Sequence, residues 1–181
     1  MIKRKDYASA QSRAADLMRK AGLKISDVEE KSIEVVDFGL SRLDEEGVQV
    51  LTLVQTERIS VKVLALFPYQ TEPEHWHPPV GKDPGKEETV RVVGGTVYFY
   101  VPGPETLSKG VIPKGKESCY TVKHEIILRP SDQITLEPGR KHWFQALDGG
   151  AVMFSFSTIA RDALDQFTDP NIVRITRIVE S

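Results

Sequence analysis

Two histidines separated by a single residue, His75 and His77, are the first residues of this sequence whose types and spacing indicate chemistry. Side chains in an extended segment alternate between two faces, so both imidazoles would point to the same side. Two adjacent glutamates, Glu87 and Glu88, follow in the same stretch, and His142 lies just after a Pro-Gly turn. Because the chain contains only four histidines, this arrangement predicts a site where three imidazoles and one carboxylate hold a metal ion.

Strand alternation indicates which of the two glutamates faces the histidines. In an extended segment Glu88 shares its face with Val90 and Val92. Glu87 falls on the opposite face, which is more polar. Since the apolar face of such a strand points into the core, we predict that Glu88 is the ligand and that Glu87 faces solvent or supports another ligand.

The predicted ligand set suits a divalent first-row metal in a catalytic site. A metal that prefers six ligands keeps positions open for substrate oxygens when only four come from the protein. A structural zinc site would usually recruit thiolates, and the lone cysteine, Cys119, excludes such a set. The alternative for each histidine is an ordinary core or surface residue whose hydrogen bonds are satisfied.

Lys62 interrupts an apolar run, ISVKVLALF, that leads toward the histidine pair. Lysine is almost never fully buried without a partner. On the residues alone, Lys62 either faces a polar cavity, where a nearby cation would suit it to proton transfer, or lies at a sheet edge and discourages strand pairing.

Several other polar side chains are weaker candidates. His124 and Glu125 are adjacent in a predicted strand, so only one of them can face inward, and we interpret them as a supporting or surface pair. Asp162, Asp165 and Asp169 are interpreted as turn residues of the tail, one of which could reach the mouth of the site.

Length and charge limit the classes of protein that fit. At 181 residues the chain suits one domain with a substantial core. The formal net charge of -2 and the lack of a basic run argue against a nucleic-acid surface. No apolar run is long enough to cross a membrane, and the charged N-terminus lacks an apolar leader. With a single cysteine, which cannot form an internal disulfide, we expect a cytoplasmic protein.

The elements that must position these residues are mostly strands. Apolar residues at helical spacing predict a helix over residues 6–21, and a capping box, Ser26 with Glu29, predicts a second short helix. Residues 1–45 would form an N-terminal helical arm, 46–160 a β-barrel and 161–181 a tail. The loop 103–118 is either a functional lid or a surface excursion. Short β-rich runs without intervening helices indicate an antiparallel sandwich or small barrel: 48–54, 59–67, 89–101, 120–128, 133–137, 142–147 and 151–159.

Taken together, H-x-H, the following glutamate and glycine, and P-G-x-x-H resemble the two motifs of the cupin superfamily. The ten residues between His77 and Glu88 form a longer insert than most cupins have. In the form EHWHPPVGKDPGKEETVR, this insert is similar to that of the compact D-lyxose ketol-isomerases, as are TVYFYVPG, YTVKHEI, KHWFQA and FTDP. The resemblance extends from about Lys62 to Asn171.

The resemblance implies a single cupin domain, an all-β double-stranded barrel with accessory helices, and a metal-dependent aldose-ketose isomerase. The substrates would be D-lyxose and D-xylulose, and by extension D-mannose and D-fructose, interconverted through a cis-enediol. It implies that His75, His77, Glu88 and His142 hold the metal, usually Mn²⁺, with Co²⁺, Fe²⁺ or Zn²⁺ as substitutes. It also implies that Lys62 is catalytic. A homodimer is expected from the helical N-terminal arm and from aromatic residues on strand surfaces, such as those at Tyr98 to Tyr100.

One position departs from the family pattern. Ser155 stands where the family has an acidic residue that transfers a proton, and serine cannot act unaided as a general base. Another carboxylate, such as Glu125 or Asp162, would have to take the proton, or the activity is altered. The alternatives are another metal-cupin enzyme, either a phosphosugar isomerase or an iron dioxygenase, and a sugar-binding cupin without catalysis.

Overall fold

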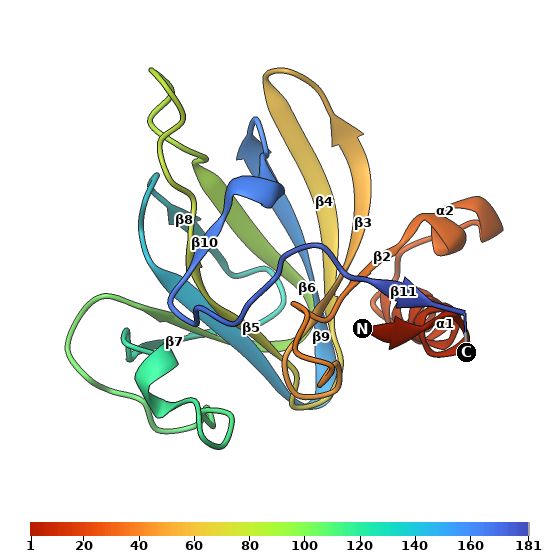
Figure 1. Ribbon diagram of the computed structural model, residues 1–181, viewed down its shortest axis with the longest axis horizontal. Helices are drawn as coiled ribbons and strands as arrows, with labels where there is room; N and C mark the ends of the chain where they lie inside the picture. The colour runs from red at the N-terminus through yellow and green to blue at the C-terminus, as the bar shows by residue number, and fades with distance from the viewer. Residues whose placement is uncertain (181) are drawn as a thin grey trace.

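Residues 1–180, which the computed structural model describes, contain nine antiparallel strands that curl into a barrel, with two helices on the outside (Figure 1). The helices are α1 (Arg4–Lys20) and α2 (Asp27–Ser32). The barrel strands are β2 (Glu34–Val36), β3 (Val48–Gln55), β4 (Ile59–Leu66), β5 (Thr71–Trp76), β6 (Glu88–Val101), β7 (His124–Leu128), β8 (Gln133–Leu136), β9 (His142–Thr158) and β10 (Gln166–Phe167). The predicted all-β cupin-like architecture with an N-terminal helix is confirmed.

Strand β9 is the centre of the barrel because it pairs with β4, β5 and β6. The sequence predicts two strands here, broken at the glycine pair, whereas the structure has one long bent strand. The bend lies where Gly150 and Gly95 of β6 both have positive φ. A Cβ on Gly95 would lie 2.1 Å from the carbonyl oxygen of Gly150, so only glycine permits the close approach of the two strands.

Helix α1 covers one outer face of the sheet. Its apolar side buries Ala10, Ala14 and Met18 in a cluster with Leu51 and Val152 of the strands. A second apolar cluster fills the barrel interior. The predicted capping box at the start of α2 is present. No helix among the residues described is both long and apolar enough to span a membrane.

The segment after β9 closes the end of the barrel that carries the histidines. It contains a short 3-10 turn, Asp162–Leu164, and then β10, which pairs with β5 at His75 and Trp76. It then crosses the barrel toward the helices (Figure 1) and ends in β11 (Ile178–Val179), which pairs in parallel with β1 (Ile2–Lys3).

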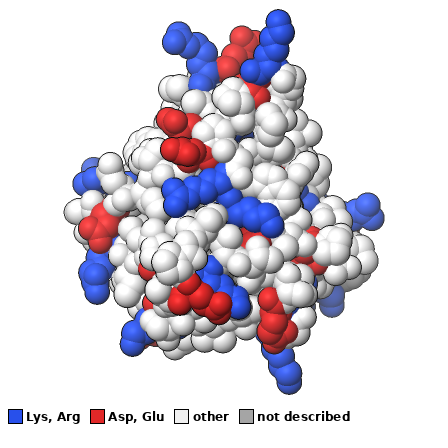
Figure 2. Space-filling model, turned by 90° about the vertical axis from the view of Figure 1, so that its left-hand side faces the viewer, with Lys and Arg blue, Asp and Glu red and all other residues white. Residues whose placement is uncertain are grey.

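The long loop that the sequence leaves open as a lid or a surface excursion is tied to strand β7 through Glu125. Glu125 accepts hydrogen bonds from the backbone N–H groups of Ser108, Lys109 and Gly110, and from the hydroxyl of Tyr100. None of the described loop residues lines the cavity beside the histidines. On the face shown in Figure 2, basic and acidic side chains are interspersed.

Candidate metal centre

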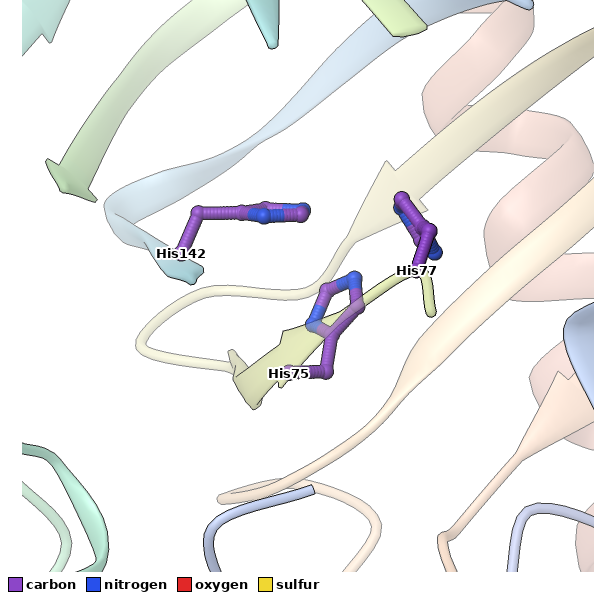
Figure 3. A group of neighbouring side chains, drawn as sticks. All are labelled: His75, His77 and His142. Carbon is purple, nitrogen blue, oxygen red and sulfur yellow. The ribbon is translucent and has the colours of Figure 1, made fainter. Parts of the chain in front are cut away.

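Three buried histidines from two distant parts of the sequence meet inside the barrel. His75 lies in β5, His77 directly follows it, and His142 is the first residue of β9. Figure 3 shows their rings facing one another, and one nitrogen from each lies within 4.8 Å of the others. The strand pairing aligns His75 with His142, so the register of β5 against β9 brings the three imidazoles together.

The other ring nitrogens are fixed by hydrogen bonds. Nδ1 of His75 lies 2.8 Å from the carbonyl oxygen of Pro73, and Nδ1 of His142 lies 2.9 Å from that of Arg140. Because a carbonyl only accepts, both Nδ1 atoms carry the proton and both Nε2 atoms keep a lone pair in the neutral rings. This is the arrangement in which a neighbouring acceptor orients a metal-binding imidazole.

His77 and Glu88 extend the cluster. Nδ1 of His77 lies 2.7 Å from Oδ1 of Asp165, and its Nε2 lies 3.1 Å from Oε2 of Glu88. Two ligand atoms bound at right angles to one cation, with bonds of about 2.1 Å, lie about 3 Å apart. The 3.1 Å between Nε2 of His77 and Oε2 of Glu88 therefore suits either a shared proton or a cation bound by both atoms. Three imidazoles and one carboxylate together are a donor set that fits a divalent metal.

Burial keeps two of the imidazoles neutral. Burial and the neighbouring His77 lower the pKa of His142 to about 3, and burial with the nearby rings lowers the pKa of His75 well below its ordinary value. Burial also disfavours the charged form of His77, but its hydrogen bonds to Asp165 and Glu88 outweigh this effect and raise its pKa. His77 is thus the imidazole at which protons compete with a metal.

The two glutamates that line the cavity, Glu72 and Glu88, differ in the protonation state that their surroundings favour. Burial opposes ionisation of Glu88, yet the nearby Lys86 and the hydrogen bond to His77 hold its pKa well below the usual range. Burial, together with the charge of Glu88, raises the pKa of Glu72 to about 8. A cation at the histidines would favour the ionised form of Glu72.

A small cavity of about 30 Å³ lies beside the histidines. This volume holds about one water molecule. Side chains of the tail form part of its wall. Polar and charged side chains from six parts of the chain line it: Lys62, Glu72, His75, His77, Lys86, Glu88, Ser155, Asp162, Asp165 and Arg174.

The predicted site lysine reaches this cavity. Lys62 is 6% exposed and lies in register with Ser155 on the neighbouring strand. Its Nζ donates to Asp162, which also lies 3.4 Å from the guanidinium of Arg174. Of the two interpretations that the residues left open, the polar cavity agrees with this position.

The two glutamates divide as strand alternation predicts. Glu88 is buried in the cavity wall, whereas Glu87 is exposed. Ser155, which cannot serve as a base, donates its hydroxyl to Oε1 of Glu88. Ser155 therefore fixes the orientation of the glutamate.

The tail contributes more side chains to the cavity wall than the one aspartate that the sequence indicated. Asp162 and Asp165 both line the cavity, whereas Asp169 pairs with Lys116 outside it. Glu125 anchors the loop instead of lining the cavity, and His124 binds the carbonyl oxygen of Pro104.

Sequence reasoning missed Glu72, Lys86 and Arg174. Glu72 lies three residues before His75, and simple alternation would place the two on opposite faces. A register shift in the pairing of β5 with β9 between these residues brings both inside. Lys86 lies in an irregular segment before β6 and Arg174 in a tail without regular structure, so neither has a periodic signal.

The aromatic residues mostly form core. Trp143, Tyr100 and Tyr120 are buried in a cluster of their own, and Phe144 is the aromatic residue in the cavity wall.

The curled antiparallel barrel and its buried histidine cluster define a cupin-like protein with a candidate metal centre. The sequence model of the D-lyxose isomerase family matches residues 10–181. The chain belongs to this family and is an isomerase.

Curated relatives match over almost their whole length. A D-lyxose ketol-isomerase of Cohnella laeviribosi is 47% identical, with 94% of each chain covered. A D-lyxose/D-mannose isomerase of Thermosediminibacter oceani is 46% identical, with 98% of this chain and 99% of the relative covered.

Solved structures support the fold. An L-ribose isomerase of Acinetobacter sp. DL28 in complex with L-ribose superposes with a TM-score of 0.80 at 16% identity, covering 98% of each chain. The L-ribose isomerase of Cellulomonas parahominis gives a TM-score of 0.78 at 17% identity, with the same coverage.

Proposed function

We propose that this isomerase interconverts D-lyxose and D-xylulose, and also D-mannose and D-fructose, with a divalent metal held by His75, His77, Glu88 and His142. The observation that carries the proposal is the convergence of three imidazoles, two with Nδ1 bound to a backbone carbonyl, beside a buried lysine. The names of two relatives, a D-lyxose ketol-isomerase and a D-lyxose/D-mannose isomerase, indicate the substrates. Mn²⁺ is the first candidate, and Co²⁺, Fe²⁺ or Zn²⁺ suit the same donors.

The bound metal would polarise the carbonyl and the adjacent hydroxyl of an open-chain sugar. Lys62 would donate a proton to, or take one from, the sugar oxygens, which its position in the cavity wall supports. Asp162 keeps the Lys62 ammonium oriented through their ion pair. Ser155 and Lys86 both contact Glu88, at its two different oxygens, and so hold the carboxylate toward the histidines. The reaction would pass through a cis-enediol, in which carbons 1 and 2 are joined by a double bond.

The cations of the cavity do not favour a phosphosugar. Lys86 pairs with Glu88, while Lys62 and Arg174 both pair with Asp162. A phosphate group would need cations that are free to bind it.

The test is an assay of a panel of aldoses for ketose formation, with Mn²⁺, Co²⁺, Fe²⁺ and Zn²⁺ in parallel, after chelation. We expect D-lyxose to be converted, activity to disappear on chelation, and Mn²⁺ to restore it. If chelation and repletion left the rate unchanged, or if no aldose were converted with any of these metals, the proposal would be wrong. Oxygen uptake with Fe²⁺ would indicate a dioxygenase, and saturable sugar binding without turnover would indicate a sugar-binding protein.

We also propose that the protein is a cytoplasmic homodimer. Four apolar side chains on β3, β4 and β9 are well exposed on the barrel surface and could be covered by a second copy: Leu53, Val54, Ile59 and Phe156. Sedimentation equilibrium tests the dimer. A monomer at micromolar concentration would contradict it.

A further inference from the structure

We propose that Glu72 is the carboxylate that moves the carbon-bound proton in the isomerisation. This inference rests on the proposed sugar isomerase function and adds the residue that the mechanism above leaves unassigned. Glu72 lies in β5 and lines the same cavity as Lys62 and the histidines.

The first argument is that the other carboxylates of the cavity already have partners. Glu88 accepts a hydrogen bond from Ser155 and pairs with Lys86. Asp162 is held by two cations, Lys62 and Arg174. A carboxylate bound in this way is a poor proton acceptor, because its lone pairs are used and cations favour its ionised form.

Asp165 is likewise committed, because its Oδ1 binds Nδ1 of His77 at 2.7 Å. Protonation of Asp165 would remove the acceptor that orients this imidazole. Its position therefore suits a residue that holds a ligand in place and not one that exchanges protons with a substrate.

Glu72, by contrast, is largely but not fully buried, with 15% of its side-chain surface exposed, and it pairs with no lysine or arginine among the described residues. Its Oε2 is fully buried and has no hydrogen-bond partner within the described residues. Leaving a carboxyl oxygen buried and unpaired is unfavourable, so folding alone does not explain its position. A group that must bind a proton and release it again needs an oxygen that is free in this way.

The backbone of β5 directs Glu72 into the site. The register shift between Glu72 and His75 places both side chains on the inner face. Oε1 of Glu72 lies 3.7 Å from Nε2 of His75, which is the ring nitrogen left free by the hydrogen bond to Pro73. A sugar that presents its first two oxygens to the histidines would therefore have its adjacent C–H bonds within reach of this carboxylate.

The chemical step balances within the substrate and two side chains. The carboxylate of Glu72 takes the proton from C2 of the aldose, the electron pair of the C2–H bond forms the C1–C2 double bond, and O1 gains a proton from Lys62. The Glu72 carboxyl then gives its proton to C1, and the O2 proton passes to Lys62 as the C2 carbonyl forms. The product is the ketose, and both side chains return to their starting state.

The test is the substitution Glu72→Gln, which keeps the size of the side chain and removes the base. We expect kcat for D-lyxose to fall by about 10²–10⁴-fold, with the same loss in the exchange of the C2 proton with solvent deuterium. The dissociation constant for Mn²⁺, measured by titration calorimetry of the metal-free protein, should rise by a far smaller factor than kcat falls, because Glu72 lies near the proposed ligands but is not one of them. Glu87→Gln, which alters an exposed glutamate near the same site, is the matched control and should behave as wild type.

A second variant guards against a loss caused by misfolding. Glu72→Ala should regain part of its activity when formate or acetate is added, because a small carboxylate can occupy the space of the missing one. The inference is overturned if Glu72→Gln keeps kcat within threefold of wild type, if its activity is lost together with Mn²⁺ binding, or if carboxylates rescue nothing. If the wild-type protein itself converts no aldose, it is the proposed function that fails.

Discussion

Residues of the site were predictable where a single strand kept its alternation. His75 and His77 share a face, and Glu88 points inward while Glu87 is exposed, as a period of two requires. Glu72 was not predictable, because a register shift in β5 overrides the alternation.

Lys62 gives the sharpest prediction at this scale. Lys62→Met keeps the length of the side chain in a position that is 6% exposed but removes the proton donor. We expect kcat to fall by about 10²–10⁴-fold while Mn²⁺ remains bound at one equivalent, measured by elemental analysis of the dialysed protein. Lys82→Met changes an exposed lysine of the nearby loop and should leave both quantities unchanged. Activity within twofold of wild type in Lys62→Met would assign the lysine to structure alone.

Among the elements, most strands and the two helices were predictable, whereas the role of the tail was not. The barrel strands fall within the predicted β-rich runs except for β2, β5 and β10, and α2 has its capping box. Residues 160–176 contain only a short turn and the two-residue strand β10, so their position depends on contacts with distant residues. Arg174 makes such contacts, since it donates to Glu34 at 2.7 Å and reaches Asp162.

We predict that this segment opens to admit a sugar, because its side chains form part of the wall of a cavity of only about 30 Å³. In Arg174→Ala we expect amide hydrogen exchange over residues 160–174 to accelerate by about 10-fold or more, since hydrogen bonds of charged groups contribute about 1.5–3 kcal/mol. The measurement is exchange followed by mass spectrometry, with saturating D-lyxose expected to slow exchange in the wild type. Arg177→Ala, at an exposed position, is the control. Equal exchange rates in the two variants would show that Arg174 does not hold the segment closed.

At the scale of the whole molecule, the metal site joins parts of the chain that only folding brings together. His75 comes from β5, His77 directly follows it, His142 comes from β9, Glu88 from β6 and Asp165 from the tail. The unfolded chain cannot present these groups to one ion, so a metal held by them would contribute directly to folding stability. Sequence motifs could predict that His75, His77 and His142 converge, but not that side chains of the tail line the same cavity.

Removing the metal should therefore lower the melting temperature, and the effect should depend on pH. At a free Mn²⁺ concentration 100 times its dissociation constant, binding should add about 2.7 kcal/mol to the free energy of unfolding. This corresponds to a rise in melting temperature of roughly 5–10 °C for a chain of this size. The pKa of His77 is raised by Asp165 and Glu88, so in the metal-free protein its protonation adds stability that is present at low pH and lost as the pH rises through the folded-state value.

The proton that binds His77 also competes with the metal. Protonation therefore stabilises the metal-free protein and weakens metal binding, and both effects reduce the difference in melting temperature between metal-bound and metal-free protein as the pH falls. His75 and His142 bring no competing proton, because their pKa values are lowered. We expect the difference in melting temperature, measured by calorimetry, to be larger at about pH 8 than at about pH 6, on either side of the ordinary imidazole pKa. Asp165→Asn removes a carboxylate that raises the pKa of His77 and should flatten this dependence, whereas His124→Gln, outside the cavity, should not. A difference that is equal at both pH values in the wild type would mean that His77 does not couple proton binding to metal binding.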